Sequence, residues 1–348
     1  MVQFDLPLAE LRRYLPDRHE PPDFDAFWAA TLAEARSSRS PATFEPFETD
    51  FTSIDVFDVT MAGFGGDPIK AWLLMPRSRT GPLPCVVEYL GYGRGRAHPL
   101  GWLTWASLGY AHLVVDARGQ GGQWSPGETA DPYPAGGPQH PGFLTRGIQN
   151  PGDYYYRRLI TDSVLAVDAV RDHPAIDRSR IAVSGTSQGG GLALAVAGLS
   201  DDIGALLADV PFLSDIRRAV VLTDESPYAE LVGYLRVRRG DVDRVFATLD
   251  YFDGVNFAVR ARAPALFAVG LMDVICPPST VFAAFNHYAG PKEIGVWPYN
   301  GHEGGGLEHT LACVRSIKAL WGRDGSASEP RNHTAATSSD GTRFTTPG

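Results

Sequence analysis

Short apolar runs alternate with helical segments over most of the chain, and this alternation predicts the fold. The runs lie at residues 84–89, 111–115, 181–184, 205–208, 265–269 and 293–297. Strands buried on both faces have this nearly continuous apolar pattern, which is typical of parallel sheets covered by helices. Helices are predicted between and after the runs, at about 154–171, 188–199, 279–288 and 306–321. The pattern favours an α/β fold with a mainly parallel central sheet flanked by helices.

Three parts of the chain depart from this alternation. Residues 1–48 form an N-terminal extension with one predicted helix, and a predicted β-hairpin follows at 54–59 and 69–75. Residues from about 212 to 260 are charged and helical in character, which indicates a helical insertion between two strands. Residues 324–348 are rich in Ser, Thr and Pro, and we expect a disordered tail. We therefore expect one domain over residues 1–323.

Composition and charge exclude several classes of protein. The 348 residues include 38 Gly and 27 Pro, too many helix-breaking residues for a helical bundle or coiled coil. The net charge of −9 argues against nucleic-acid and anionic membrane partners. No apolar stretch approaches the ~18 residues of a membrane span, and the charged N-terminus is unlike a signal peptide. We therefore expect a cytoplasmic protein.

The cysteines and histidines do not follow the spacing of a metal site. Cys85, Cys276 and Cys313 are widely spaced, which excludes a disulfide framework and a paired-cysteine zinc site. The segment HEGGGLEH, which contains His302 and His309, lacks the HExxH spacing of zinc proteases. We expect neither a metal nor a cofactor.

The motif with the most specific chemistry is G-x-S-x-G at residues 185–189. It lies between the apolar run IAVS and the small-residue helix GGGLALAVAGL. A nucleophile elbow has this context, because a sharp strand-to-helix turn exposes the serine and glycines relieve the crowding. The same glycines do not match the G-x-G-x-x-G motif of dinucleotide-binding proteins. We predict that Ser187 is a nucleophile, the alternative being an ordinary glycine-rich turn.

An acid and a base are expected in loops after later strands, in the order Ser, Asp, His. Asp273 follows the run at 265–269, and its alternative role is a helix-capping or turn aspartate. His302 lies in the loop after the last run. The other histidines beyond Asp273 fall on predicted helices or in the tail: His287, His309 and His333. We predict that His302 is the base and that Asp273 orients it.

Two backbone N–H groups are predicted to stabilise an oxyanion. In such a fold, one belongs to the residue after the nucleophile, here Gln188, and the other to a loop after an earlier strand. That loop is residues 90–95, and Tyr92 is the candidate donor. Segment 116–122 follows a central strand, and structural support is favoured there over substrate contact for Arg118. The aromatic and arginine-rich segment 142–158 is interpreted as packing or a subunit interface.

These motifs resemble the acetyl xylan esterase / cephalosporin C deacetylase family of α/β-hydrolases. The matching segments span roughly residues 20–321 and include RGQGG, GFLTRGIQNPGDYYYRRLITD, GTSQGG, DVPFLSDIRRA, YFDGVNFA, GLMDVICPPST and YNGHEGG. The resemblance implies the α/β-hydrolase fold, a Ser187–Asp273–His302 triad, and oxyanion donors at Tyr92 and Gln188. Arg118 and Gln120 of the RGQ motif are expected to support the site. At the oxyanion loop the family usually has the sequence His-Gly-Tyr-Asn-Gly. This chain has Leu90-Gly91-Tyr92-Gly93-Arg94 there.

The resemblance also implies an activity and an assembly. The expected protein is a cofactor-independent serine carboxylesterase that deacetylates small esters such as acetylated xylo-oligosaccharides and cephalosporin C. A tight acyl pocket is implied, with Tyr92, Phe212 and Pro277 as candidate substrate contacts. A ring-like homohexamer is implied too. Its support in the sequence is a set of apolar residues on the extension and the insertion, which instead could cover their own sheet: Phe24, Phe27, Trp28, Tyr228, Leu231, Tyr234 and Leu235.

Two alternative functions remain open at this point. One is another α/β-hydrolase, such as a general short-chain carboxylesterase, a peptidase or a lipase. The chain has no repeats that would form a propeller, and its insertion is charged rather than an apolar lid. The other is a non-catalytic binding protein on a hydrolase scaffold, whose sequence would lack a member of the triad. No member is lost here.

Overall fold

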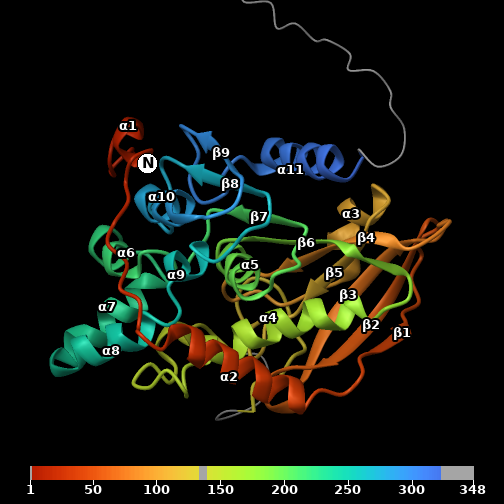
Figure 1. The fold of residues 1–348 in the computed structure, drawn as a ribbon, viewed down its shortest axis with the longest axis horizontal. Coiled ribbons are helices and arrows are strands. Elements are labelled where there is room, and N and C mark those ends of the chain that lie inside the picture. Colours follow the sequence, from red (N-terminus) through yellow and green to blue (C-terminus); the bar gives the residue numbers. More distant parts are fainter. Residues whose placement is uncertain (1, 133–138, 323–348) are drawn as a thin grey trace, which may run out of the picture.

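The computed structural model describes residues 2–132 and 139–322, and the strands within them form one nine-stranded sheet (Figure 1). The strands lie in the order β1-β2-β3-β5-β4-β6-β7-β8-β9. Their bounds are β1 (Thr43–Pro46), β2 (Ile54–Ala62), β3 (Pro68–Pro76), β4 (Leu83–Tyr89), β5 (Ala111–Val115), β6 (Ile176–Thr186), β7 (Ala205–Asp209), β8 (Ala265–Gly270) and β9 (Lys292–Trp297).

Strand direction changes along the sheet. β1, β2, β3 and β5 pair antiparallel in turn, and the pairing of β2 with β3 is the predicted hairpin. From β5 to β9 all neighbouring strands are parallel. These six parallel strands are the six apolar runs of the sequence, so the predicted mainly parallel sheet is confirmed. β1 was not predicted, because its four residues are mostly exposed and have no apolar run.

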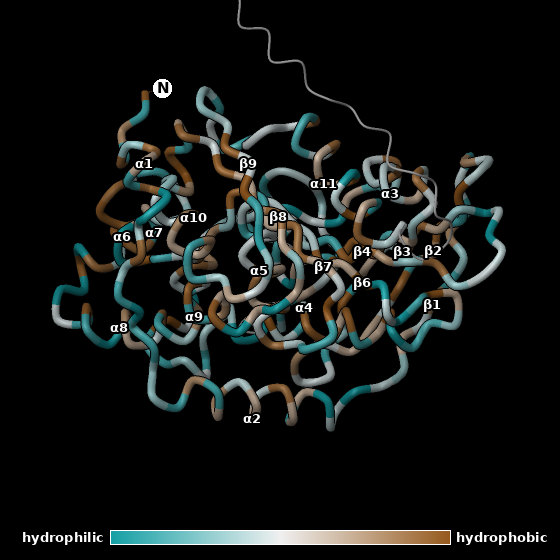
Figure 2. The backbone as a smooth tube through the Cα atoms, turned by 45° about the horizontal axis from the view of Figure 1, so that its top comes forward, coloured by the Kyte–Doolittle hydropathy of each residue, from teal (hydrophilic) through white to brown (hydrophobic). Residues whose placement is uncertain are grey.

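Helices cover both faces of the sheet (Figure 1). Successive side chains of β4 show the division, since Val87 packs in the cluster that includes α4 and α5, whereas Val86 packs with α3 and α11. In Figure 2 the hydrophobic positions follow the central strands, and hydrophilic positions predominate near α8 and β1. The helix bounds are α1 (Leu8–Leu11), α2 (Phe24–Ser37), α3 (Leu103–Ser107), α4 (Tyr155–Arg171), α5 (Gln188–Leu199), α6 (Ile216–Leu222), α7 (Tyr228–Val237), α8 (Val242–Leu249), α9 (Gly254–Ala258), α10 (Pro278–His287) and α11 (Gly306–Trp321).

The N-terminal extension packs on the insertion of the same chain. Phe24 and Trp28 of α2 are 1% exposed, and their rings contact Phe257 at 5.3 Å and Phe252 at 5.6 Å. Tyr228 of α7 is fully buried as well. These three side chains are covered within one chain and give no independent support for an oligomer, whereas Phe27, Tyr234 and Leu235 are only partly buried. The expected hexamer stays a prediction.

The sequence also predicted four helices, a helical insertion and a disordered tail. The predicted helices correspond to α4, α5, α10 and α11, with ends shifted by at most one residue. The insertion comprises α6 to α9. The expected disordered tail at 324–348 lies outside the described residues. Among the described residues, no helix has the length and apolar character needed to cross a membrane.

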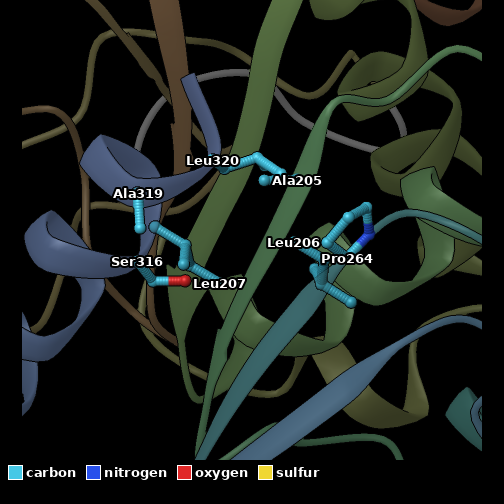
Figure 3. A pocket seen from close by; sticks show the side chains of 7 residues that line it. All are labelled: Ala205, Leu206, Leu207, Pro264, Ser316, Ala319 and Leu320. Atoms are coloured by element: carbon cyan, nitrogen blue, oxygen red, sulfur yellow. The ribbon is translucent and has the colours of Figure 1, made fainter. Parts of the chain in front are cut away.

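An apolar hollow of about 210 Å³ lies at the amino-terminal ends of β7 and β8 (Figure 3). The last turns of α11 form its other wall. It is lined by Ala205, Leu206, Leu207, Pro264, Ser316, Ala319 and Leu320. None of these side chains titrates, and the carboxyl ends of the same strands lie at the opposite edge of the sheet. Ligands of open α/β sheets bind at the carboxyl edge, where the candidate residues lie.

Candidate active site

Ser187 occupies a strained turn between β6 and α5. Its backbone angles are φ 60° and ψ −120°, a region that residues with a Cβ rarely adopt. The flanking glycines make the turn possible. A Cβ on Gly189 would lie 2.0 Å from the carbonyl oxygen of Tyr89, and one on Gly185 would lie 2.3 Å from the backbone of Gly189. This strand–turn–helix geometry is that of a nucleophile elbow.

Asp273 and His302 form a direct pair at the carboxyl ends of β8 and β9. Nδ1 of His302 lies 2.9 Å from Oδ2 of Asp273. The other oxygen, Oδ1, accepts hydrogen bonds from the backbone N–H groups of Ile275 at 2.8 Å and Cys276 at 3.0 Å. Asp273 is fully buried, whereas the His302 side chain is 27% exposed. The fixed carboxylate therefore orients the ring, and Nε2 has no hydrogen-bond partner within residues 2–132 and 139–322.

Cys276 connects this pair to the serine. Its sulfur, a carboxylate oxygen of Asp273 and a ring nitrogen of His302 all lie within 4.8 Å of one another. The Ser187 hydroxyl interacts with the Cys276 side chain, and burial raises the pKa of the thiol well above its ordinary value. The three residues predicted from the sequence therefore meet around one neutral thiol. Sequence reasoning had given Cys276 no role at the site, although it lies only three residues after Asp273.

Two buried glutamines join the loop at residues 90–95 to the elbow. The Gln188 side chain donates to the carbonyl oxygen of Leu90 at 3.1 Å. Gln120 donates to the Gln188 side chain at 2.9 Å and accepts a hydrogen bond from the backbone N–H of Gly93 at 2.6 Å. Both glutamines are fully buried. These bonds fix the loop that contains Tyr92 beside the start of α5.

The backbone N–H groups of Tyr92 and Gln188 are available to a ligand. Gln188 is the first residue of α5, where an N–H has no acceptor within the helix. The N–H of Tyr92 donates to no other group in the described part of the chain. Two such donors, held by the glutamine bridge, are suited to the negatively charged oxygen of a tetrahedral intermediate.

The other predicted site residues are buried. Arg118 is fully buried, and its guanidinium binds both oxygens of Asp162, at 2.6 and 2.8 Å. This contact favours a supporting role. Phe212 has no exposed surface and packs on Tyr228 at 4.6 Å, while Pro277 is buried. Contact of Phe212 or Pro277 with a substrate stays a prediction.

Two clusters in the described residues have the donors that a metal ion needs. One is the Asp273–Cys276–His302 group described above. The other joins the end of β7 to α11, where Nε2 of His309 lies 2.9 Å from Oδ1 of Asp209 and Cys313 completes the group. One carboxylate, one imidazole and one thiol are ligands that zinc accepts. The sequence expectation of no metal stays untested.

Comparisons with known proteins agree with this geometry. The family model described as acetyl xylan esterase (AXE1) matches residues 1–317. Acetyl esterase Axe7A of Xylanibacter ruminicola is 30% identical over 302 residues, which are 82% of this chain and 64% of that protein. The chain thus spans 64% of the length of this relative.

Two solved structures are similar over nearly their whole length. An acetyl xylan esterase from Paenibacillus sp. R4 is 40% identical with a TM-score of 0.82, covering 90% of this chain and 99% of that chain. Acetyl xylan esterase 1 from Thermoanaerobacterium sp. JW/SL YS485 is 32% identical with a TM-score of 0.81, covering 91% of this chain and 100% of that chain. The expected resemblance and the α/β-hydrolase fold are both confirmed by these matches.

Proposed function

Because the chain belongs to the acetyl xylan esterase family, we propose that it is a serine esterase that removes acetyl groups from small esters. The proposed substrates are acetylated xylo-oligosaccharides and acetylated cephalosporins such as cephalosporin C. The observation that carries the proposal is the meeting of Ser187 with the Asp273–His302 pair around Cys276. A binding protein would have no need of a strained serine beside an oriented histidine.

The proposed reaction has two steps that use the same groups. Oγ of Ser187 attacks the ester carbonyl carbon, and Nε2 of His302 accepts the hydroxyl proton while Asp273 stabilises the charged ring. The N–H groups of Tyr92 and Gln188 bind the oxyanion. His302 gives its proton to the leaving alcohol, which leaves an acetyl group on Ser187. Water then attacks this ester while His302 accepts its proton, and His302 returns that proton to Oγ of Ser187 as acetate is released.

Acyl-chain length is expected to govern the rate. In this proposal the acyl group lies against Tyr92 and Phe212, whose ring centroids are 6.2 Å apart, so a longer acyl chain would have to displace these rings. Forcing extra methylenes into a packed site costs about 1–3 kcal/mol. We therefore expect kcat/KM for 4-nitrophenyl acetate to exceed that for the butyrate by about tenfold or more. Rates are compared after correction for the alkaline hydrolysis of each ester. A steady rise from acetyl to octanoyl would contradict the acetyl specificity and favour a lipase.

Assembly is a separate proposal that rests on the family. We expect a homohexamer, which light scattering coupled to size-exclusion chromatography would report as six times the 37.6 kDa chain mass. A mass of 37.6 kDa at micromolar concentration would contradict it. The deacetylase proposal does not depend on this result, since the site residues named above come from one chain.

A further inference from the structure

The hydroxyl group of Tyr92 is the meeting point of three segments of the chain. It accepts hydrogen bonds from the backbone N–H groups of Phe143 at 2.8 Å, Leu144 at 3.2 Å and Gly142 at 3.3 Å. It donates its own proton to Oε2 of Glu230 at 2.7 Å. Since a phenolic hydroxyl has one proton to donate, its only donated bond goes to Glu230.

Glu230 reaches Tyr92 from the helical insertion. It lies in α7, and 138 positions separate it from Tyr92 along the chain. Its carboxyl group is partly buried, and this burial raises its pKa above the ordinary value. Oε2 also accepts a hydrogen bond from the backbone N–H of Leu144 at 3.4 Å. A hydrogen bond to a carboxylate is stronger than one between neutral groups. The bond to Glu230 is therefore the strongest hydrogen bond of the Tyr92 hydroxyl.

Packing fixes the rest of the Tyr92 side chain. The ring contacts Phe143 at 5.5 Å and Phe212 at 6.2 Å, and the residue is only 9% exposed. With the ring enclosed and the hydroxyl anchored, the side chain cannot turn without moving its own Cα and peptide group. The direction of the Tyr92 N–H is therefore coupled to the bond with Glu230.

We propose that Glu230 is a positioning residue for the esterase reaction, because its bond to the Tyr92 hydroxyl fixes the Tyr92 N–H toward the oxyanion. This inference rests on the proposed function, in which that N–H is an oxyanion donor. Removal of an oxyanion donor costs on the order of 10²–10³ in kcat, and a misdirected donor loses part of that effect. Glu230 acts through Tyr92, so its loss should slow the reaction without weakening substrate binding.

Three variants separate this role from a merely structural one. Glu230→Leu removes the acceptor, Glu230→Gln keeps an acceptor oxygen without the charge, and Tyr92→Phe removes the hydroxyl but keeps the ring. Glu225→Leu is the matched control, because Glu225 is an exposed glutamate of the same insertion. Each variant is assayed with 4-nitrophenyl acetate. Its affinity for an arylboronic acid, which mimics the tetrahedral intermediate, is measured in parallel.

The expected results form one pattern. Glu230→Leu should lower kcat about tenfold with KM changed less than twofold, and the boronic acid should bind weaker by the same factor as kcat/KM falls. Glu230→Gln should recover at least about a third of the wild-type kcat. Tyr92→Phe should lower kcat by the same factor as Glu230→Leu. A variant with both substitutions should lose no more kcat than either single variant. Glu225→Leu should behave as wild type.

Several outcomes would overturn the inference. These are an unchanged kcat in Glu230→Leu, a loss confined to KM, or boronic acid affinity that does not follow kcat/KM. If Glu230→Leu does not fold, Tyr92→Phe decides on the same criteria. The proposed function fails in a different way, because a wild-type protein without activity on acetyl esters would remove the esterase itself. An active wild type with an indifferent Glu230 removes only the positioning role.

Discussion

Replacing Ser187 with alanine is expected to lower kcat for 4-nitrophenyl acetate by about 10⁴-fold or more. In the proposed mechanism this change removes the nucleophile, and the oxyanion donors alone cannot form the acetyl-enzyme. The substitution removes one oxygen and keeps the backbone of the turn, whose φ of 60° an alanine tolerates as well as a serine. Thermal unfolding should therefore stay within a few degrees of wild type.

The control for Ser187→Ala is a test that the variant is folded. Far-ultraviolet circular dichroism and the thermal melt must match the wild-type protein before rates are compared. A folded variant that kept more than about a tenth of the wild-type kcat would show that Ser187 is not the nucleophile.

Gly189→Ala is expected to have the largest effect on the fold near the site. A Cβ at this position would lie 2.0 Å from the carbonyl oxygen of Tyr89, so β4 and the start of α5 would have to separate. Overpacking of this kind costs about 3 kcal/mol or more, because backbone rather than a flexible side chain must move. The same movement would displace Gln188 and the elbow. We expect a clear fall in the free energy of unfolding together with a loss of activity.

A matched glycine separates this effect from helix propensity. Gly233 lies within α7, and apart from the adjoining backbone of that helix a Cβ there would meet no heavy atom of the described residues within 4 Å. Gly233→Ala should be neutral or should stabilise the protein by up to about 1 kcal/mol, since alanine favours helix. Urea unfolding of both variants gives the comparison. Equal stability of Gly189→Ala and the wild type would contradict the close packing of α5 on β4.

The geometry of the candidate site could be predicted because its signals are local in the sequence. The elbow needs only a strand, five residues and a helix, all of which are contiguous around Ser187. Asp273 and His302 were predicted from their places after two apolar runs. In the structure Nδ1 of His302 lies 2.9 Å from Oδ2 of Asp273. Parallel strands impose this meeting, because their carboxyl ends share one edge of the sheet.

The features that could not be predicted from the sequence depend on contacts between segments that are distant along the chain. Glu230 is one charged residue on a charged helix, and nothing nearby marks it as the partner of a tyrosine 138 positions away. Pairing of β3 with β5 rather than with β4, its neighbour in sequence, is likewise a long-range choice. Exposed residues in β1 gave no apolar signal. Apolar residues of α2 suggested a subunit contact, but the insertion of the same chain covers them.

Identification of the acylated residue tests the central claim most directly. The wild-type protein is mixed with 4-nitrophenyl acetate, quenched in acid within the first turnover, digested and examined by mass spectrometry. We expect one acetyl group on Ser187, absent when the reaction is quenched after the substrate is consumed. Cys276, whose side chain interacts with the Ser187 hydroxyl, is the rival acceptor. Acetyl on Cys276 instead of Ser187, or turnover with no acetylated residue, would contradict the proposed mechanism.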